Sequence, residues 1–390
     1  MEDKIDFEIG SLTIMLNFID LFEKEKIQMA IHIKEFNIQE YRGIKNLTLK
    51  NLNSINILTG NNNSGKTSIL EILATVDNPQ DVGTWVLPSR LTNIRIRKST
   101  FFNGFFSMFP VDSENRQISY AYLTPDGKKT KIRLEGELEE TQIPESEMHR
   151  LNGLLRTGSS KEESEIVDTT CLHLSIFIGD KKVNNYSLYD FQTRISRFIN
   201  KYKSFVRSVF VSPADHTTGM IFLDDVMADA QLYEQLLKIL QEFDSNIINI
   251  TSIKTKYGMS EYMILTKDHQ SAIPLNSYGD GMKKALLLLS AIVRAQNGIL
   301  LLDEFETGIH TSAMNSVFAW LLQSALKLNV QVFLTSHSKE AIDKILRLDN
   351  KLHSHINVYT LYKCDGVNYV RRLSCEEAIK AQEQLGLEIR

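Results

Sequence analysis

The chain has 390 residues, of which 43% are hydrophobic and 24% charged, as expected of a globular protein with one large or two intertwined domains. Its formal net charge of -4 argues against a globally basic nucleic-acid-binding protein, although a local basic face is compatible with that sum. The three cysteines show neither zinc nor disulfide spacing and no apolar run approaches transmembrane length, which predicts a cytoplasmic protein without membrane contact.

Residues 1–28 mix apolar positions such as Leu12, Ile14 and Leu16 with acidic residues, a pattern that an amphipathic helix produces. A strand-like segment begins directly after Met29. We therefore expect an N-terminal extension that is dispensable or that results from an upstream start codon. An interaction helix is the alternative interpretation, although apolar stripes at helical spacing more often belong to a core.

The segment after residue 30 has the layout of an α/β nucleotide-binding fold. Strands are expected at 31–38, 47–50 and 55–59, and the last runs into a glycine loop and a helix over 66–74. In the C-terminal part, helices and strands alternate with short links, as in a parallel sheet with crossovers. The elements expected there are helices over 280–294, 312–327, 338–347 and 376–384 and strands over 299–302, 330–335, 356–362 and 367–372.

The middle of the chain has a different pattern, in which strands follow strands. Turn residues predict hairpins over 116–138 and 169–190, and the polar segment 139–165 between them is expected to form a mobile loop or short helices. The elements expected after the second hairpin are a strand over 205–212, an amphipathic helix over 222–243 and strands near 247–254 and 260–265.

A glycine loop between the strand at 55–59 and the next helix matches the pattern G-x-x-x-x-G-K-[ST]. Glycines let successive backbone N–H groups surround phosphates at a helix N-terminus, which predicts a nucleotide site with Lys66 at the β- and γ-phosphates and Thr67 as a Mg²⁺ ligand. A glycine turn that only caps a helix is the less common alternative. The expected nucleotide-binding residues of this loop are Gly60, Asn61, Asn62, Asn63, Ser64, Gly65, Lys66, Thr67 and Ser68.

The apolar strand at 299–302 ends in two carboxylates, Asp303 and Glu304. A buried strand of this kind delivers an acid to the phosphate side of a sheet. We expect Asp303 to hold the Mg²⁺ shell through water and Glu304 to orient or deprotonate the water that attacks the γ-phosphorus. Taken alone, an apolar strand followed by acids is more often only a strand end, and the glycine loop favours the functional interpretation.

Two further segments complete the set of motifs. Ser277, Gly279 and Gly281 lie at the start of the helix over 280–294, where a hydroxyl group, glycine amides and a helix N-terminus form a second anion site for a neighbouring molecule. His337 follows the strand at 330–335 and is expected to contact the γ-phosphate. Each segment also has a simpler interpretation, a plain helix cap for the first and a structural or capping histidine for the second.

The order of these motifs resembles the ABC ATPase superfamily and, within it, the OLD-like group of AAA/ABC ATPases. Four short segments carry the resemblance. They are Tyr41-Arg42-Gly43-Ile44, Gly279-Asp280-Gly281-Met282-Lys283, Leu302-Asp303-Glu304-Phe305-Glu306-Thr307-Gly308-Ile309-His310 and Thr335-Ser336-His337-Ser338. The resemblance implies an α/β fold, namely an ABC-type P-loop ATPase head with a mixed or parallel sheet and an inserted α+β region. It divides the chain into an extension (1–28), a first ATPase part (29–100), the insertion (101–268) and a second ATPase part (269–390).

The resemblance also implies ATP and Mg²⁺ as cofactors, with Lys66, Glu304 and His337 as catalytic residues. The chain is expected to form a head-to-tail dimer or a higher homo-oligomer, in which Ser277 and Gly279 act on the ATP of the partner. OLD nucleases carry a C-terminal TOPRIM domain, which we expect this chain to lack, so their nuclease activity is not carried over. In several bacterial families, relatives without it are the ATPase halves of anti-phage systems, which implies a separately encoded nuclease or toxin as partner.

Two alternatives belong to other functional classes. A DNA-repair clamp would need a basic groove and strongly salt-dependent DNA binding, and this alternative leaves nucleic acid open as a partner. An ATP-binding scaffold with little turnover is the other alternative, although such a scaffold would not need Glu304. The basic residues that a clamp would use are Arg95, Arg97, Lys98, Lys201, Lys203 and Arg207, which are more often part of a solvated face.

Overall fold

The computed structural model describes residues 30–90, 100–111, 115–152, 165–193, 206–217, 221–254 and 260–385. The expected extension at 1–28 lies outside the described residues. So do five of the basic residues that the DNA-clamp alternative would use, namely Arg95, Arg97, Lys98, Lys201 and Lys203.

The sheet that ends in the glycine loop is built from both ends of the chain. Its strands are Ile55–Gly60 (β3), Ser208–Val211 (β8), Ile299–Leu302 (β12), Gln331–Thr335 (β13), Ile356–Cys364 (β14) and Val367–Ser374 (β15). They follow one another in the order β15-β14-β3-β13-β12-β8, and all neighbours are parallel except the β14–β15 hairpin. β3, β12 and β13 are buried throughout, as expected of parallel strands covered on both faces, and the predicted α/β class is confirmed.

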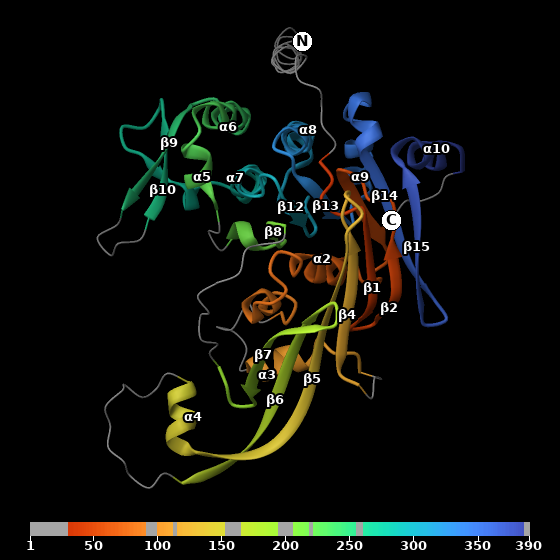
Figure 1. Ribbon diagram of the computed structural model, residues 1–390. Coiled ribbons are helices and arrows are strands. Elements are labelled where there is room, and N and C mark those ends of the chain that lie inside the picture. The colour runs from red at the N-terminus through yellow and green to blue at the C-terminus, as the bar shows by residue number, and fades with distance from the viewer. Residues whose placement is uncertain are drawn as a thin grey trace.

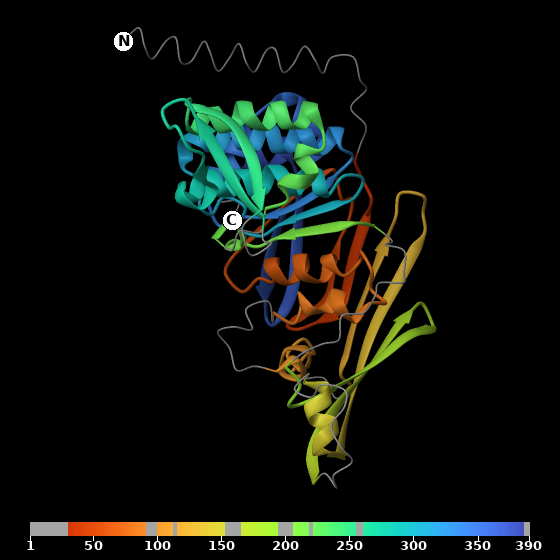
Figure 2. The ribbon, with the colours of Figure 1, turned by 90° about the vertical axis from the view of Figure 1, so that its left-hand side faces the viewer.

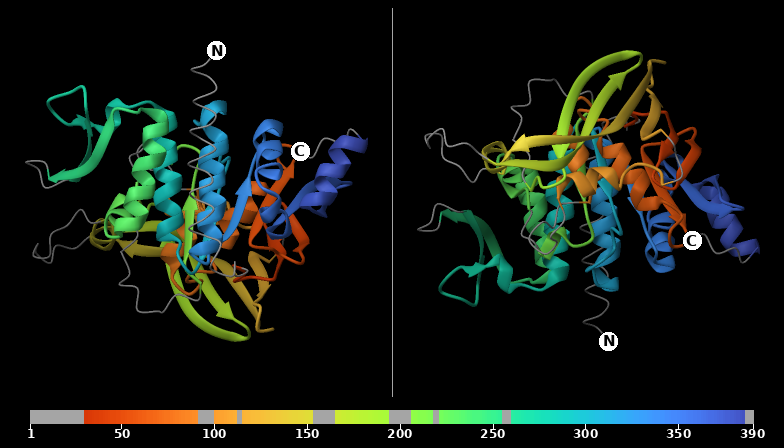
Figure 3. Two further views of the ribbon diagram at one scale, coloured as in Figure 1. Left: turned by 90° about the horizontal axis from the view of Figure 1, so that it is seen from above. Right: turned by 90° about the horizontal axis from the view of Figure 1, so that it is seen from below.

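Helices cover both faces of this sheet. They are Lys66–Ala74 (α2), Asp280–Arg294 (α7), Thr311–Lys327 (α8), Lys339–Leu346 (α9) and Cys375–Leu385 (α10). Alternate strand residues serve the two faces: Leu300 and Leu302 join the core formed with α7, α8 and α9, whereas Ile299 and Leu301 join the core that contains α2. Seen from above, α7, α8, α9 and α10 form a row from teal to dark blue (Figure 3).

A second, antiparallel sheet packs against the α2 side. It contains Glu35–Tyr41 (β1), Ile44–Leu49 (β2), Gln117–Leu123 (β4), Lys129–Pro144 (β5), Ile166–Ile178 (β6) and Lys181–Tyr189 (β7). The order β2-β1-β4-β5-β6-β7 joins the first two strands of the chain to both predicted hairpins. Its core includes residues of α2, of the short helix Phe101–Phe106 (α3) and of the 3-10 turn Val82–Val86 (η1). β5 and β6 curve away from the rest of the molecule (Figures 1 and 2).

The prediction of a mobile loop or short helices over 139–165 is wrong for its first part. β5 continues through Pro144 and pairs with β6 as far as the partners Pro144 and Ile166. The side chains of this extension are mostly exposed, so main-chain pairing rather than an apolar face maintains the strand. A short helix, Glu145–Leu151 (α4), follows as predicted.

A small three-stranded sheet contacts the helix Ala230–Phe243 (α6). It consists of Ile247–Lys254 (β9), Ser260–Thr266 (β10) and Ile273–Pro274 (β11), in the order β11-β10-β9. The single helix predicted over 222–243 is two helices, Leu223–Met227 (α5) and Ala230–Phe243 (α6). Asp229 separates them because its backbone is extended and its carboxylate accepts the N–H groups of Gln231 and Leu232, so that it caps a new helix.

Candidate nucleotide-binding site

The glycine loop connects the buried strand β3 to α2 and contains three residues with positive φ. Gly60 and Gly65 have φ of 135° and 98°, and Asn63 has φ of 62°. A Cβ atom at Gly60 would come within 2.2 Å of the carbonyl oxygen of Leu361, so β14 leaves room only for glycine there. No side chain caps α2, whose first N–H groups are therefore arranged to receive an anion.

Lys66 and Ser64 provide polar atoms inside this loop. The ammonium group of Lys66 donates hydrogen bonds to the carbonyl oxygens of Gly60 (2.7 Å) and Asn61 (3.0 Å). Burial lowers the pKa of Lys66, and Asp303 and Glu304 partly oppose this effect. The hydroxyl group of Ser64 is buried and has no hydrogen-bond partner among the described residues. The loop thus combines a buried cation, an unpaired hydroxyl group and uncapped N–H groups, a set that fits a polyphosphate.

Asp303 lies where α2, β12 and β13 meet. Its Oδ1 atom accepts a hydrogen bond from the hydroxyl group of Thr67 (3.1 Å) and a second from that of Thr335 (2.6 Å). The Thr335 hydroxyl group in turn accepts the backbone N–H of Glu304 (2.8 Å). Hydroxyl and carboxylate oxygens are ligand types that Mg²⁺ prefers, so Thr67 and Asp303 fit the predicted metal site. Within the described residues no group of three or more His, Cys, Asp and Glu side chains is placed to hold a metal ion.

Glu304 and His337 face each other at the mouth of the site. Glu304 Oε1 lies 3.7 Å from His337 Nε2, and the two side chains are 42% and 41% exposed. Glu304 has φ of 43°, a strained conformation for a residue with a side chain. The hydrogen bond from its N–H group to Thr335 holds it in this position. These two side chains, both predicted to be catalytic, are therefore close together and accessible to water.

Glu306 organises the loop that carries His337, although it was not predicted as a site residue. Its Oε1 atom accepts hydrogen bonds from the Ser336 hydroxyl group (2.7 Å) and from the N–H groups of His337 and Ser338 (both 3.2 Å). Thr335 was likewise missed as a site residue. Both residues belong to the motifs quoted above. The only sequence signal for them was that they are polar and lie at the end of a strand or shortly after it.

Ser277 ends the 3-10 helix Leu275–Ser277 (η3), Gly279 is the N-cap of α7, and Gly281 is the second residue of α7. No hydrogen bond within the described residues joins any of the three to residues 60–68. Gly281 instead packs against the turn after Glu306, since a Cβ atom there would lie 3.3 Å from the carbonyl oxygen of Gly308. A Cβ atom at Gly279 would meet no atom within 4 Å, so this residue borders open space.

A second polar cluster fixes α2 to the antiparallel sheet. Glu71 is buried and accepts hydrogen bonds from Arg90 Nε (2.7 Å) and Nη2 (3.1 Å) and from the Tyr41 hydroxyl group (3.2 Å). Burial raises the pKa of Glu71, and the hydrogen bond from Arg90 opposes this effect. Arg90 also donates to Ser68 Oγ (3.3 Å). This network therefore reaches Ser68, which directly follows the glycine loop.

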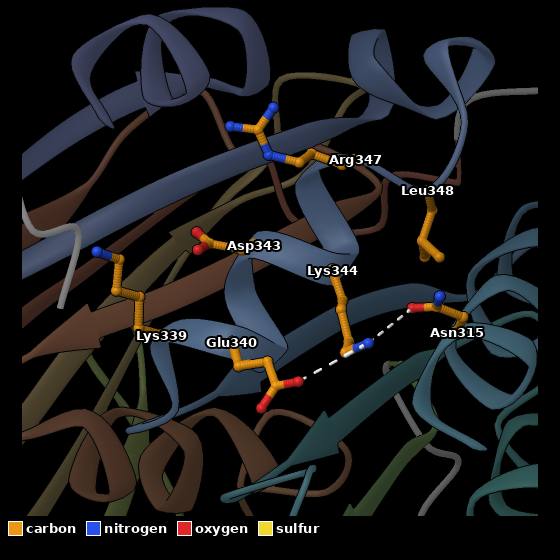
Figure 4. A pocket seen from close by; sticks show the side chains of 7 residues that line it. All are labelled: Asn315, Lys339, Glu340, Asp343, Lys344, Arg347 and Leu348. Carbon is orange, nitrogen blue, oxygen red and sulfur yellow. Dashed lines mark hydrogen bonds and ion pairs between the residues drawn. The ribbon is translucent and has the colours of Figure 1, made fainter. Parts of the chain in front are cut away.

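The cavity shown in Figure 4 is separate from the glycine loop. It has a volume of about 620 Å³ and is lined by Asn315, Lys339, Glu340, Asp343, Lys344, Arg347 and Leu348 of α8, α9 and the residues that follow α9. The charged groups pair locally: Lys344 reaches Glu340 and Asn315, and Arg347 reaches Glu383. None of the predicted nucleotide-site residues lines this cavity, so it is not the candidate site.

No helix among the described residues has both the length and the apolar character needed to cross a membrane.

Comparisons relate this chain to several known proteins. Residues 55–343 match a protein family described as "AAA domain, putative AbiEii toxin, Type IV TA system". An ATP/GTP phosphatase of Helicobacter pylori is 27% identical over 350 residues, which cover 82% of this chain and 90% of that protein. The DNA replication and repair protein RecF of Rickettsia typhi is 24% identical over 220 residues, 56% of this chain and 52% of that protein. Among solved structures, an Smc head bound to the C-terminal winged-helix domain of ScpA has 14% identity and a TM-score of 0.47, with 90% of this chain and 99% of that chain covered.

Proposed function

Because this chain belongs to the AAA-domain family of the AbiEii type, it is an ATPase, and we propose that it hydrolyses ATP in a head-to-tail homodimer. The observation that carries the proposal is the cluster at the end of β12, where Thr67, Asp303, Glu304 and His337 meet. The relative named ATP/GTP phosphatase supports nucleotide hydrolysis and makes GTP a second candidate substrate.

Each residue of the cluster has a proposed role that follows from its surroundings. Lys66 exchanges its two carbonyl partners for the β- and γ-phosphate oxygens, and the uncapped N–H groups of α2 bind the remaining oxygens. Thr67 and Asp303 hold Mg²⁺, which neutralises phosphate charge when it is bound. Glu304 is open to water and takes the proton of the attacking water molecule, while His337 contacts the γ-phosphate.

The dimer proposal rests on the position of the α7 start. Ser277 and Gly279 make no hydrogen bond to residues 60–68 of their own chain, and Gly279 borders open space. A helix start with a free glycine amide can bind the phosphates of a partner molecule. In a twofold dimer each nucleotide would then lie between the glycine loop of one chain and the α7 start of the other.

We further propose that this ATP cycle controls a separately encoded nuclease or toxin in bacterial anti-phage defence. The resemblance of the motifs to those of the OLD-like group and the toxin–antitoxin description of the family support this proposal. A DNA-repair clamp is the second candidate, favoured by the partial similarity to the RecF protein. Fluorescence anisotropy with duplex DNA at 50 and 200 mM salt separates the two, because a clamp should bind with about 10³-fold or greater salt dependence.

ATP turnover of purified wild-type chain, Lys66→Ala and Glu304→Gln tests the function, with molecular mass measured by light scattering with and without ATP. We expect turnover to fall in both variants by about 10²-fold or more, and Glu304→Gln to accumulate an ATP-bound dimer. Glu304→Gln turnover equal to that of the wild type would refute the assigned base. A wild-type chain without turnover would instead favour a nucleotide-binding scaffold, or an ATPase that needs its partner.

A further inference from the structure

Lys284 is a buried cation near the proposed site, and the roles given above do not use it. Its side chain in the second turn of α7 is 0% exposed, and Nζ has no hydrogen-bond partner among the described residues. An unpaired charge inside a protein is strongly unfavourable, so a buried lysine normally has a carboxylate partner. The neighbouring Lys283 differs, since it lies near the surface and pairs with Asp280 at 2.7 Å.

Carboxylates on two parts of the chain attract the ammonium group of Lys284. Asp215 belongs to the 3-10 turn Asp215–Thr217 (η2), and Glu306, Asp303 and Glu304 follow β12. Burial lowers the pKa of Lys284, and these four carboxylates oppose the effect. Burial lowers the pKa of His216 in η2, and the ammonium group of Lys284 lowers the pKa of this imidazole further.

Glu306 is the acid that leaves a buried oxygen atom unpaired. Asp303 Oδ1 already accepts two hydrogen bonds, and both oxygens of Asp215 accept hydrogen bonds from Ser212. Glu304 is open to solvent. Glu306 Oε2 is buried and has no hydrogen-bond partner among the described residues, whereas Oε1 holds the loop with His337. The ammonium group of Lys284 and the Oε2 atom of Glu306 are thus both buried and unpaired, and their opposite charges attract each other.

We propose that Lys284 is a positioning residue that pairs with Glu306 when the nucleotide site closes, and so fixes the loop that carries His337. The proposal rests on the proposed function. α7 begins at the residues that would bind the partner's nucleotide, and Gly281 in its first turn touches Gly308. A small shift of α7 towards Glu306 would therefore couple occupation of one nucleotide site to the position of His337 in the other.

Steady-state kinetics of Lys284→Met, Glu306→Gln and the double variant test this proposal, with Lys283→Met as the matched control. Met has a similar shape without charge, so Lys284→Met should unfold at the same temperature as the wild type or higher. Its kcat should fall by roughly 5- to 150-fold with little change in the KM for ATP. Lys284→Arg should recover part of kcat, and Lys283→Met should match the wild type.

The double variant separates a shared role from two independent roles. If Lys284 acts through Glu306, Lys284→Met/Glu306→Gln should be no slower than the slower single variant. The proposal would be overturned if the loss of kcat in the double variant equalled the product of the two single losses. It would also be overturned if Lys284→Met had the kcat of the wild type, or if that variant unfolded at a lower temperature than the wild type. The proposed function has a separate test. It predicts that Lys66→Ala abolishes turnover, whatever the behaviour of Lys284→Met.

Discussion

The hydroxyl oxygen of Thr67 lies 3.1 Å from Oδ1 of Asp303, although the two residues are 236 positions apart in the chain. β13 lies between the strands that deliver them, and its last residue, Thr335, donates to the same carboxylate oxygen. The proposed metal site therefore needs three strand ends in one register. A change in β13 should disturb the site even though this strand provides no predicted metal ligand.

Replacing Thr335 by Val removes the hydroxyl group that joins Asp303 Oδ1 to the Glu304 N–H at almost constant volume. We expect turnover to fall by about 10- to 100-fold, as for other residues that orient metal ligands. The free energy of unfolding should fall by about 1–3 kcal/mol, because a buried N–H group loses its acceptor. ATPase assays and urea denaturation measure the two effects. Thr335→Ser keeps the hydroxyl group, and a serine variant as slow as Thr335→Val would contradict this role.

Replacing Arg90 by Met leaves the buried Glu71 carboxylate with fewer hydrogen bonds. We expect the free energy of unfolding to decrease by about 1–3 kcal/mol, since a charged acceptor loses its donors inside the protein. The double variant Arg90→Met/Glu71→Leu should recover part of this loss, because it also removes the buried charge. Denaturation curves that show the double variant to be the less stable of the two would refute this explanation.

The buried side chain of His355 should make the free energy of unfolding depend on pH. It lies at the end of the 3-10 helix Asn350–His355 (η4), and burial lowers its pKa below the usual 6.5. The unfolded chain therefore binds a proton at higher pH than the folded chain, so stability present above pH 6.5 is lost as the pH falls. Urea denaturation at pH 7.5 and 5.5 should show a smaller loss for His355→Gln than for the wild type. Equal losses in both proteins would count against this assignment.

Several elements could be predicted closely because local signals and tertiary structure agree. The helices over 66–74 and 280–294 and the strand over 299–302 have the predicted bounds. Each segment has an apolar pattern that is typical of one element type, helix or strand. A glycine lies directly before each of the two helices. The two middle hairpins also formed around their predicted turns.

The arrangement of the strands could not be predicted, because pairing between distant segments leaves no local pattern. β1 and β2 were expected with the glycine loop but join the sheet of the hairpins, whereas β8 of the middle region pairs with β12. The domain boundaries drawn from the sequence remain a prediction.

The supporting residues of the site were missed for a related reason. Lys283 and Lys284 are adjacent lysines in the sequence, yet a helix places them about 100° apart, so one is near the surface and the other in the core. Glu306 and Thr335 have roles only through contacts that cross between strands and loops. Glycine-rich and charged motifs indicated the groups that are proposed to touch the nucleotide, whereas the residues that position those groups could be found only from the fold.

The central claim is that each nucleotide is shared between two chains, and the most direct test is the turnover of a purified heterodimer of Lys66→Ala and Gly279→Asp. Gly279 has φ of -65° and open space around it, so aspartate fits there, while its carboxylate would repel the phosphates of a partner. Each variant alone should be inactive. The heterodimer contains one intact pair of glycine loop and α7 start, so it should regain turnover that both homodimers lack, up to about half of the wild-type value. A heterodimer without turnover, or a Gly279→Asp homodimer as active as the wild type, would contradict the account.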